Sequence, residues 1–134
     1  MNQQRAARFG FLKLVVRELK HEVQFYQAVL GCGEGQFIVG EIAGRPIEEI
    51  LLTGPGGETE MLIMIYTDGR DPAAQPTGVI TGIFTPNIEA FEQRVLAAGG
   101  RVVQPIGPIQ LPTGASRLAF YADPEDYLLE VIEG

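Results

Sequence analysis

The sequence predicts an α+β fold, in which two tandem βαβββ modules form a curved, partly open eight-stranded sheet with a concave pocket. Three observations lead to this class. The hydrophobic period changes twice from two residues to about 3.6, three short strand-like runs follow each helical stretch, and a polar connector separates the two halves. We therefore expect a single domain, 1–134, with modules at 9–66 and 79–133 and a connector at 67–78.

The first module begins with the β-rich run Phe9–Val16. From Glu18 onwards the apolar residues are spaced for one face of a helix, and Gly31 ends it. This helical face consists of Leu19, Val23, Tyr26 and Leu30. The three strands predicted after it are Gln36–Ile42, Ile47–Thr53 and Glu60–Tyr66.

The second module repeats this pattern after the Pro-, Gly- and Asp-rich connector. Val79–Thr85 is predicted as a strand, and Asn87 is placed to cap the following helix. The helical face consists of Ile88, Phe91, Val95 and Ala98, and Gly99-Gly100 ends it. The remaining predictions are the strands Arg101–Gln104, Ser116–Ala122 and Tyr127–Ile132, with a proline-rich loop over Pro105–Gly114.

The composition limits the classes of partner. Seventeen acidic and ten basic residues give a net charge of -7, which repels nucleic acid and anionic membrane surfaces. No apolar run reaches the roughly 20 residues of a membrane span, and the N-terminus has no secretory apolar region. Cys32 is the only cysteine, so no internal disulfide is possible and a cytoplasmic location is expected.

Three segments carry a family resemblance: Leu14 to Leu19 leading into Phe25-Tyr26-Gln27-Ala28-Val29-Leu30-Gly31, the second helical run Phe91 to Gly100, and Asp123-Pro124-Glu125-Asp126-Tyr127-Leu128-Leu129-Glu130. On these the chain resembles the vicinal-oxygen-chelate superfamily of glyoxalases, bleomycin-resistance proteins and extradiol dioxygenases. The resemblance spans almost the whole chain. It implies the fold and says little about the reaction, because this scaffold hosts many activities.

In metal-using members, the resemblance implies a ligand position on the first and last strand of each module, usually His, Gln or Glu. Here these positions fall on Phe11, on Leu62 or Ile63, on Ile80 and on Glu130. Only Glu130 is a ligand type, whereas a catalytic metal needs about three protein ligands. We therefore expect no metal and no cofactor.

Strand alternation predicts which side chains line the pocket. Lys13 shares a strand face with Phe11 and Val15, while Leu12, Leu14 and Val16 face the helix. Lys13 would pair with Glu130 or hold a ligand's carboxylate, although a surface lysine is an alternative. The full set of predicted lining residues is Phe11, Lys13, Val15, Ile63, Ile80, Phe84, Arg117, Tyr121 and Glu130. Arg117 is a candidate anion contact and Tyr121 a candidate hydroxyl donor, with solvated and core alternatives respectively.

Other polar residues have simpler interpretations. His21 is expected to be solvated, Cys32 inert, and Glu48 and Glu49 to be charges at a strand end.

The resulting hypothesis is a protein that binds a small organic ligand, aromatic or cationic, in an apolar pocket with one polar pole made by Lys13 and Glu130. The alternative is an enzyme of the same superfamily: a lyase, isomerase or dioxygenase. It would be metal-free, with Glu130 as candidate general base and Lys13 contacting an oxyanion, or metal-dependent. A scaffold role with a filled pocket is a third alternative. The resemblance also implies a homodimer, with the modules paired within or between chains.

Overall fold

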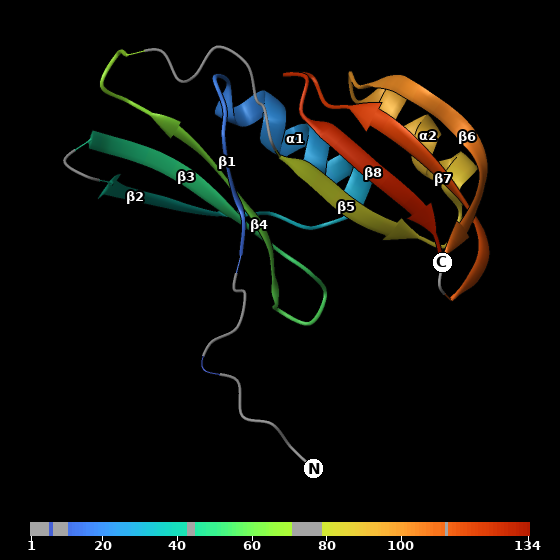
Figure 1. Cartoon of the computed structure of the whole chain (residues 1–134). Helices are drawn as coiled ribbons and strands as arrows, with labels where there is room; N and C mark the ends of the chain where they lie inside the picture. The colour runs from blue at the N-terminus through green and yellow to red at the C-terminus, as the bar shows by residue number, and fades with distance from the viewer. Residues whose placement is uncertain (1–5, 7–10, 43–44, 71–78, 112) are drawn as a thin grey trace.

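The computed structural model describes residues 6, 11–42, 45–70, 79–111 and 113–134, and it contains two repeats of the same element order (Figure 1). The first repeat consists of β1 (Lys13–Val15), α1 (Leu19–Leu30), β2 (Gln36–Ile42), β3 (Arg45–Thr53) and β4 (Thr59–Tyr66). The second consists of β5 (Ile80–Thr85), α2 (Ile88–Ala97), β6 (Arg101–Leu111), β7 (Gly114–Ala122) and β8 (Leu128–Glu133). The predicted α+β class with two tandem βαβββ modules is confirmed.

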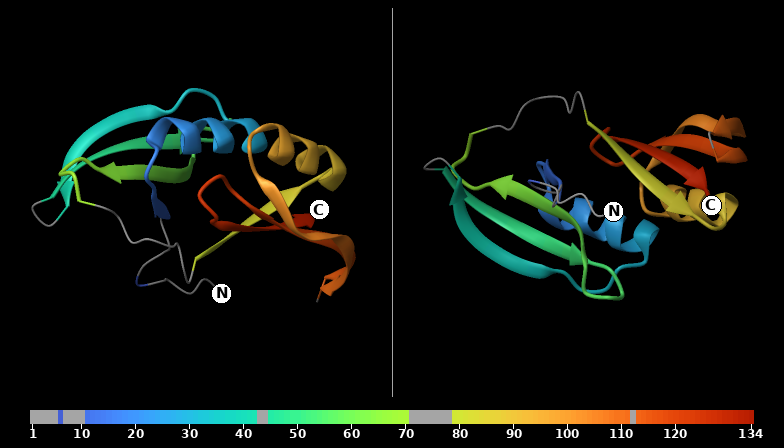
Figure 2. Two further views of the ribbon diagram at one scale, coloured as in Figure 1. Left: turned by 90° about the horizontal axis from the view of Figure 1, so that it is seen from above. Right: turned by 60° about the horizontal axis from the view of Figure 1, so that its bottom comes forward.

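Each repeat forms its own four-stranded sheet, with strand orders β1-β4-β3-β2 and β5-β8-β7-β6. In both sheets the strand before the helix pairs in parallel with the last strand, and the other pairs are antiparallel. The helix provides the crossover that a parallel pair requires. The two sheets are inclined to one another, and α1 and α2 follow one another along one side of the molecule (Figure 2).

Local sequence signals account for the helix boundaries. α1 ends at Gly31, whose φ of 72° is left-handed, and its amide donates to the carbonyl of Gln27. α2 starts at Asn87, whose side chain accepts a hydrogen bond from the amide of Ala90 at 3.0 Å, as predicted. Gly100 after α2 allows a close approach, because a Cβ there would lie 2.9 Å from the carbonyl oxygen of Ala122.

The structure corrects the predicted loop over Pro105–Gly114. β6 continues through this segment to Leu111 as an outer strand of the second sheet, with register shifts between Val102 and Gln104 and between Gln104 and Gly107. Proline lacks an amide donor and is tolerated on an outer strand and at irregularities of the ladder. The predicted start of the first strand at Phe9 and the connector residues 71–78 lie outside the described residues.

One core joins the two modules. Its fully buried aromatic residues come from both halves: Phe25 and Tyr26 from α1, Phe91 from α2 and Tyr121 from β7. Leu14 and Val16 belong to this core, which confirms the predicted helix-facing side of the first strand. Among the described residues, none of the helices has the length and apolar character needed to cross a membrane.

Candidate functional site

The candidate site lies on the side of the sheets that points away from α1 and α2, which we call the open face. In the first sheet, Lys13 and Val15 lie on this face, because the alternating neighbours Leu14 and Val16 pack in the helix-side core. In the second sheet, Leu129 and Val131 belong to the core, so Glu130 points to the open face.

Lys13 forms an ion pair on the open face of the first sheet. Its Nζ lies 2.9 Å from Oε1 of Glu49, and the side chains are 29% and 10% exposed. The contact is an ion pair rather than an aligned hydrogen bond, since Oε1 meets no donor at hydrogen-bonding angles. Two expectations are therefore corrected. Lys13 pairs with Glu49 rather than with Glu130, and Glu49 is a buried residue in the middle of β3 rather than a charge at its end.

Glu130 has a different environment on the second sheet. In the strand register it lies between Gly82 of β5 and Phe120 of β7. The side chain is half-buried and makes no hydrogen bond or ion pair with another described residue. The space above Gly82 is open, because a Cβ there would meet no atom within 4 Å. A carboxylate beside an open backbone stretch is free to accept a hydrogen bond or to attract a cation from a ligand.

Two large apolar side chains lie on β5, the strand next to Glu130. Ile80 and Phe84 lie two residues to either side of Gly82, and they are 56% and 75% exposed. Phe11, which precedes β1, is also exposed. These three were predicted as lining residues, and their exposure leaves them available for contact.

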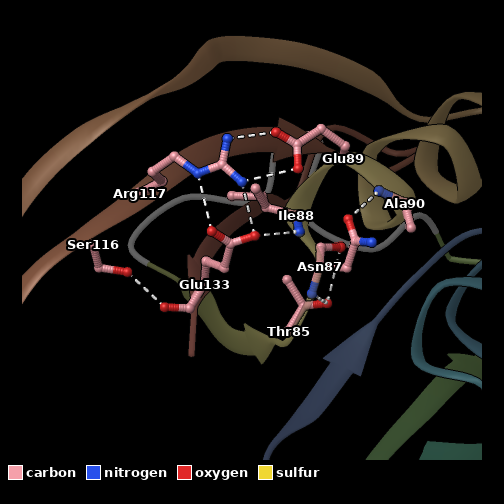
Figure 3. A network of polar contacts seen from close by, with 8 residues as sticks. All are labelled: Thr85, Asn87, Ile88, Glu89, Ala90, Ser116, Arg117 and Glu133. Carbon is pink, nitrogen blue, oxygen red and sulfur yellow. Dashed lines mark hydrogen bonds and ion pairs between the residues drawn. The ribbon is translucent and has the colours of Figure 1, made fainter.

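Arg117 was predicted to point into the pocket, and the structure places it on the helix side instead (Figure 3). It hydrogen-bonds to the carboxylates of Glu89 at the start of α2 and Glu133 of β8. Glu133 also accepts the amide of Ile88 at 3.0 Å. The two carboxylates raise the pKa of Arg117, and the guanidinium lowers the pKa of Glu89. Arg117 therefore fastens α2 to the sheet, with its charge compensated.

Tyr121 and Ile63 also lie on the helix side, which corrects their placement among the pocket-lining residues and agrees with the core alternative for Tyr121. The Tyr121 ring packs 6.0 Å from that of Phe91, and its hydroxyl donates to Oε1 of Glu92 at 3.0 Å. Burial, followed by this contact, raises the Tyr121 pKa. Ile63 is fully buried in the core, whereas its neighbour Leu62 lies opposite Lys13 in the register. Leu62 is thus the open-face residue of that pair.

The modules meet at a polar junction that was not predicted from the sequence. The Glu125 carboxylate, in the turn between β7 and β8, accepts the amides of Arg17 and Glu18 before α1. The hydroxyl of Tyr127 donates to the carbonyl of Val15 at 2.6 Å, and that of Tyr26 donates to Oδ2 of Asp123 at 2.7 Å. These contacts hold β1 and α1 against the turn of the second module.

Glu22 is the unexpected member of this junction, because it is fully buried in α1. Burial, followed by the neighbouring Asp123, raises the pKa of Glu22 from 4.5 to about 10. A signal was present in the sequence, since Glu22 falls within the apolar stripe of Leu19, Val23 and Tyr26 at helical spacing.

The residues at the family's metal positions do not fit a metal. Phe11, Leu62 and Ile80 supply no nitrogen or oxygen donor, so Glu130 has no partner ligand at these positions. Within the described ranges, no group of three His, Cys, Asp or Glu side chains could hold a metal ion. His21 is largely exposed, 4.0 Å from Glu18, and the half-buried Cys32 has its Sγ 3.9 Å from the carbonyl of Tyr26.

Comparisons with known proteins identify the fold. No protein-family model and no curated protein sequence matches the chain. Among solved structures, a glyoxalase family protein from Bacillus cereus is 15% identical, with a TM-score of 0.77 over 99% of this chain and 97% of its own. A glyoxylase/bleomycin resistance protein/dioxygenase domain from Frankia sp. EAN1pec is 17% identical, with a TM-score of 0.68 over 97% and 99%.

A third structure, a glyoxalase/bleomycin resistance protein from Albidiferax ferrireducens T118, is 23% identical, with a TM-score of 0.65 over 94% of this chain and 98% of its own. These proteins match the chain over nearly their full lengths, and their strand and helix arrangement is the one predicted from the three motif segments. The chain therefore has the fold of the glyoxalase/bleomycin-resistance/dioxygenase, or vicinal-oxygen-chelate, superfamily.

Proposed function

We propose that the protein binds a small organic ligand on the open face of the second sheet, with Glu130 as the polar contact. The observation that carries this proposal is the half-buried Glu130 carboxylate, which has no polar partner among the described residues and lies beside the exposed side chains of Ile80 and Phe84. Exposed apolar side chains around one polar group are typical of a ligand site.

The arrangement favours a particular ligand chemistry. A flat apolar group fits over Gly82, which has no side chain, between Ile80 and Phe84. An amine or another donor on the ligand would reach Glu130, because a carboxylate accepts hydrogen bonds and attracts cations. Lys13 is compensated by Glu49, so we assign it no role in holding a ligand anion. The ligand class is therefore aromatic amines and related cations rather than aromatic acids.

A thermal-shift screen tests this proposal, since a ligand bound only by the native state raises the melting temperature. We expect aromatic amines to raise it and Phe84→Ala to remove the shift. Leu96→Ala is the matched control, because Leu96 is an exposed apolar residue on α2. The proposal fails if no compound of this class raises the melting temperature, or if Phe84→Ala and Leu96→Ala respond alike.

The second candidate is a metal-free enzyme with Glu130 as general base, which the same unpaired carboxylate favours. Glu130→Gln separates the two functions for any compound that binds. In an enzyme, turnover should fall by about 10² or more, whereas a binding protein should keep its affinity for neutral aromatic compounds. No turnover by the unaltered protein with any bound compound would exclude the enzyme for those compounds.

A homodimer is a further part of the proposal. It is supported by Phe37 and Val39, which are strongly exposed apolar residues on the outer strand β2. Exposed apolar side chains grouped on one strand are typical of interaction surfaces. Sedimentation equilibrium tests it: a mass of two chains for the unaltered protein and of one chain for Val39→Lys is the expected pair of results. A single-chain mass for both would contradict it.

A further inference from the structure

The junction between the modules contains two buried carboxyl groups, Asp123 and Glu22. They differ in the number of hydrogen bonds that they accept. Asp123, directly after β7, is 2% exposed. Its Oδ1 accepts the amides of Glu125 and Tyr127 at 2.8 and 3.0 Å, and its Oδ2 accepts the hydroxyl of Tyr26 at 2.7 Å. Three donors on one carboxyl group are the surroundings of an ionised carboxylate.

Glu22 receives none of these donors. It lies one helical turn before Tyr26 in α1 and is 0% exposed, and neither of its carboxyl oxygens has a hydrogen-bond donor among the described residues. A buried carboxylate without a donor or a cation is strongly disfavoured. A protonated Glu22 removes the charge and can itself donate to Asp123, which is an acceptor on the opposite module.

We propose that Glu22 and Asp123 share one proton across the junction, so that the two modules are latched together by an acid pair that holds only while Glu22 keeps its proton. This proton belongs to the folded protein alone, because unfolding exposes both side chains to water. The latch is independent of any ligand on the open face. Folding near neutral pH should therefore take up about one proton per chain.

The groups around Glu22 favour its neutral form. From the turn of the second module it faces the acidic Asp123 and Glu125 and the phenol of Tyr127, and from its own helix it faces Tyr26. Arg94 of α2 donates to the carbonyl of Val29 at the other end of α1. The elements β3 and β4 present apolar residues such as Leu52, Met61 and Ile63.

The ionisable groups near Glu22 in the sequence face solvent: Lys20 is exposed, and the side chains of Glu18 and His21 are 76% and 54% exposed. Burial, followed by the neighbouring Asp123, raises the pKa of Glu22 to about 10. A negative charge at Glu22 would be repelled by Asp123 and Glu125, the two charged groups that act on it most strongly. Loss of the proton should therefore loosen α1 from the turn.

The direction of the pH dependence follows from the pKa difference. The unfolded chain loses the Glu22 proton near pH 4.5, and the folded protein keeps it to about pH 10. The folded state thus binds more protons throughout this window, and its stability falls as the pH rises. Glu22→Gln keeps a neutral donor of the same shape and has no proton to lose.

The experiment compares urea unfolding of the unaltered protein and of Glu22→Gln between pH 6 and 9. The ratio of their unfolding equilibrium constants should rise about tenfold per pH unit, whereas Glu34→Gln, which removes an exposed acid, should give a constant ratio. A constant ratio for Glu22→Gln as well would overturn the proposal.

A second measurement needs no variant. In the unaltered protein with ¹³C-labelled glutamate, the carboxyl signal of Glu22, assigned through its bonded backbone resonances, should stay at its protonated shift from pH 5 to 8. Titration of that signal below pH 6 would show that Glu22 ionises like an ordinary acid, and it would refute the latch even if Glu22→Gln did not fold.

Discussion

On the open face of the first module, Lys13 is matched by the buried Glu49, whereas on that of the second module Glu130 meets no partner among the described residues. The helices differ in a related way. α2 is capped by Asn87 of its own module, while the amides before α1 are satisfied by Glu125 of the other module. One topology has therefore been used twice with different distributions of charge. In the first module, Lys13 is paired with Glu49, and the amides before α1 are bound by Glu125 of the second module. In the second module, the Glu130 carboxylate has no polar partner among the described residues.

The largest effect should come from breaking the pair in the first module. Lys13→Met leaves Glu49, which is 8% exposed, without its cation. We expect a loss of about 3 kcal/mol in the free energy of unfolding, measured by urea denaturation. The double variant Lys13→Met/Glu49→Leu should recover most of this loss, because it leaves no charge unpaired. Equal losses in the single and double variants would show that the pair does not matter.

A smaller effect should follow from removing a helix cap in each module. Glu125→Ala and Asn87→Ala each leave amides without an acceptor, so each should lower the free energy of unfolding by about 1 kcal/mol. Amide hydrogen exchange distinguishes them. Exchange should become faster at Arg17 and Glu18 in the first variant and at Ala90 in the second. If Glu125→Ala left exchange before α1 unchanged, the cap supplied by the second module would be refuted.

The smallest effect should come from Glu130→Gln. Since Glu130 makes no polar contact with a described residue, the free energy of unfolding should change by no more than about 0.5 kcal/mol. The comparison with Lys13→Met measures how far the two open faces differ. A loss as large as that of Lys13→Met would mean that Glu130 is a structural residue rather than a contact for a ligand.

The fold was predictable because its strongest signals are local. The cap at Asn87, the stop at Gly31 and the two helical stripes depend on nearby residues, and they gave both helices and the tandem order. The part of β6 that follows Gln104 was mistaken for a loop, because Pro105 and Pro108 resemble turn residues in the sequence. Only pairing with β7 reveals that this segment is extended.

The positions of the site residues depend on register, which a single sequence does not contain. Arg117 and Tyr121 were correctly placed on one face of a strand, but alternation does not say which face meets the helix. The partner of Lys13 depends on the pairing of β1 with β4 and of β4 with β3, which brings Glu49 into line with Met64. The burial of Glu22 does not depend on strand register. It could have been predicted, because Glu22 lies within the apolar stripe of the first helix.

The irregular outer strand β6 has a consequence for the colloidal behaviour of the protein. An outer strand is a template on which another chain can add by hydrogen bonding. Pro105 and Pro108 offer no amide hydrogen, and two register shifts interrupt the ladder nearby. β2, the outer strand of the other sheet, contains no proline, and it carries the exposed Phe37 and Val39. The prolines and register shifts of β6 therefore protect that edge against the addition of another chain. β2 lacks this protection, so a solubilising substitution would have the most effect there.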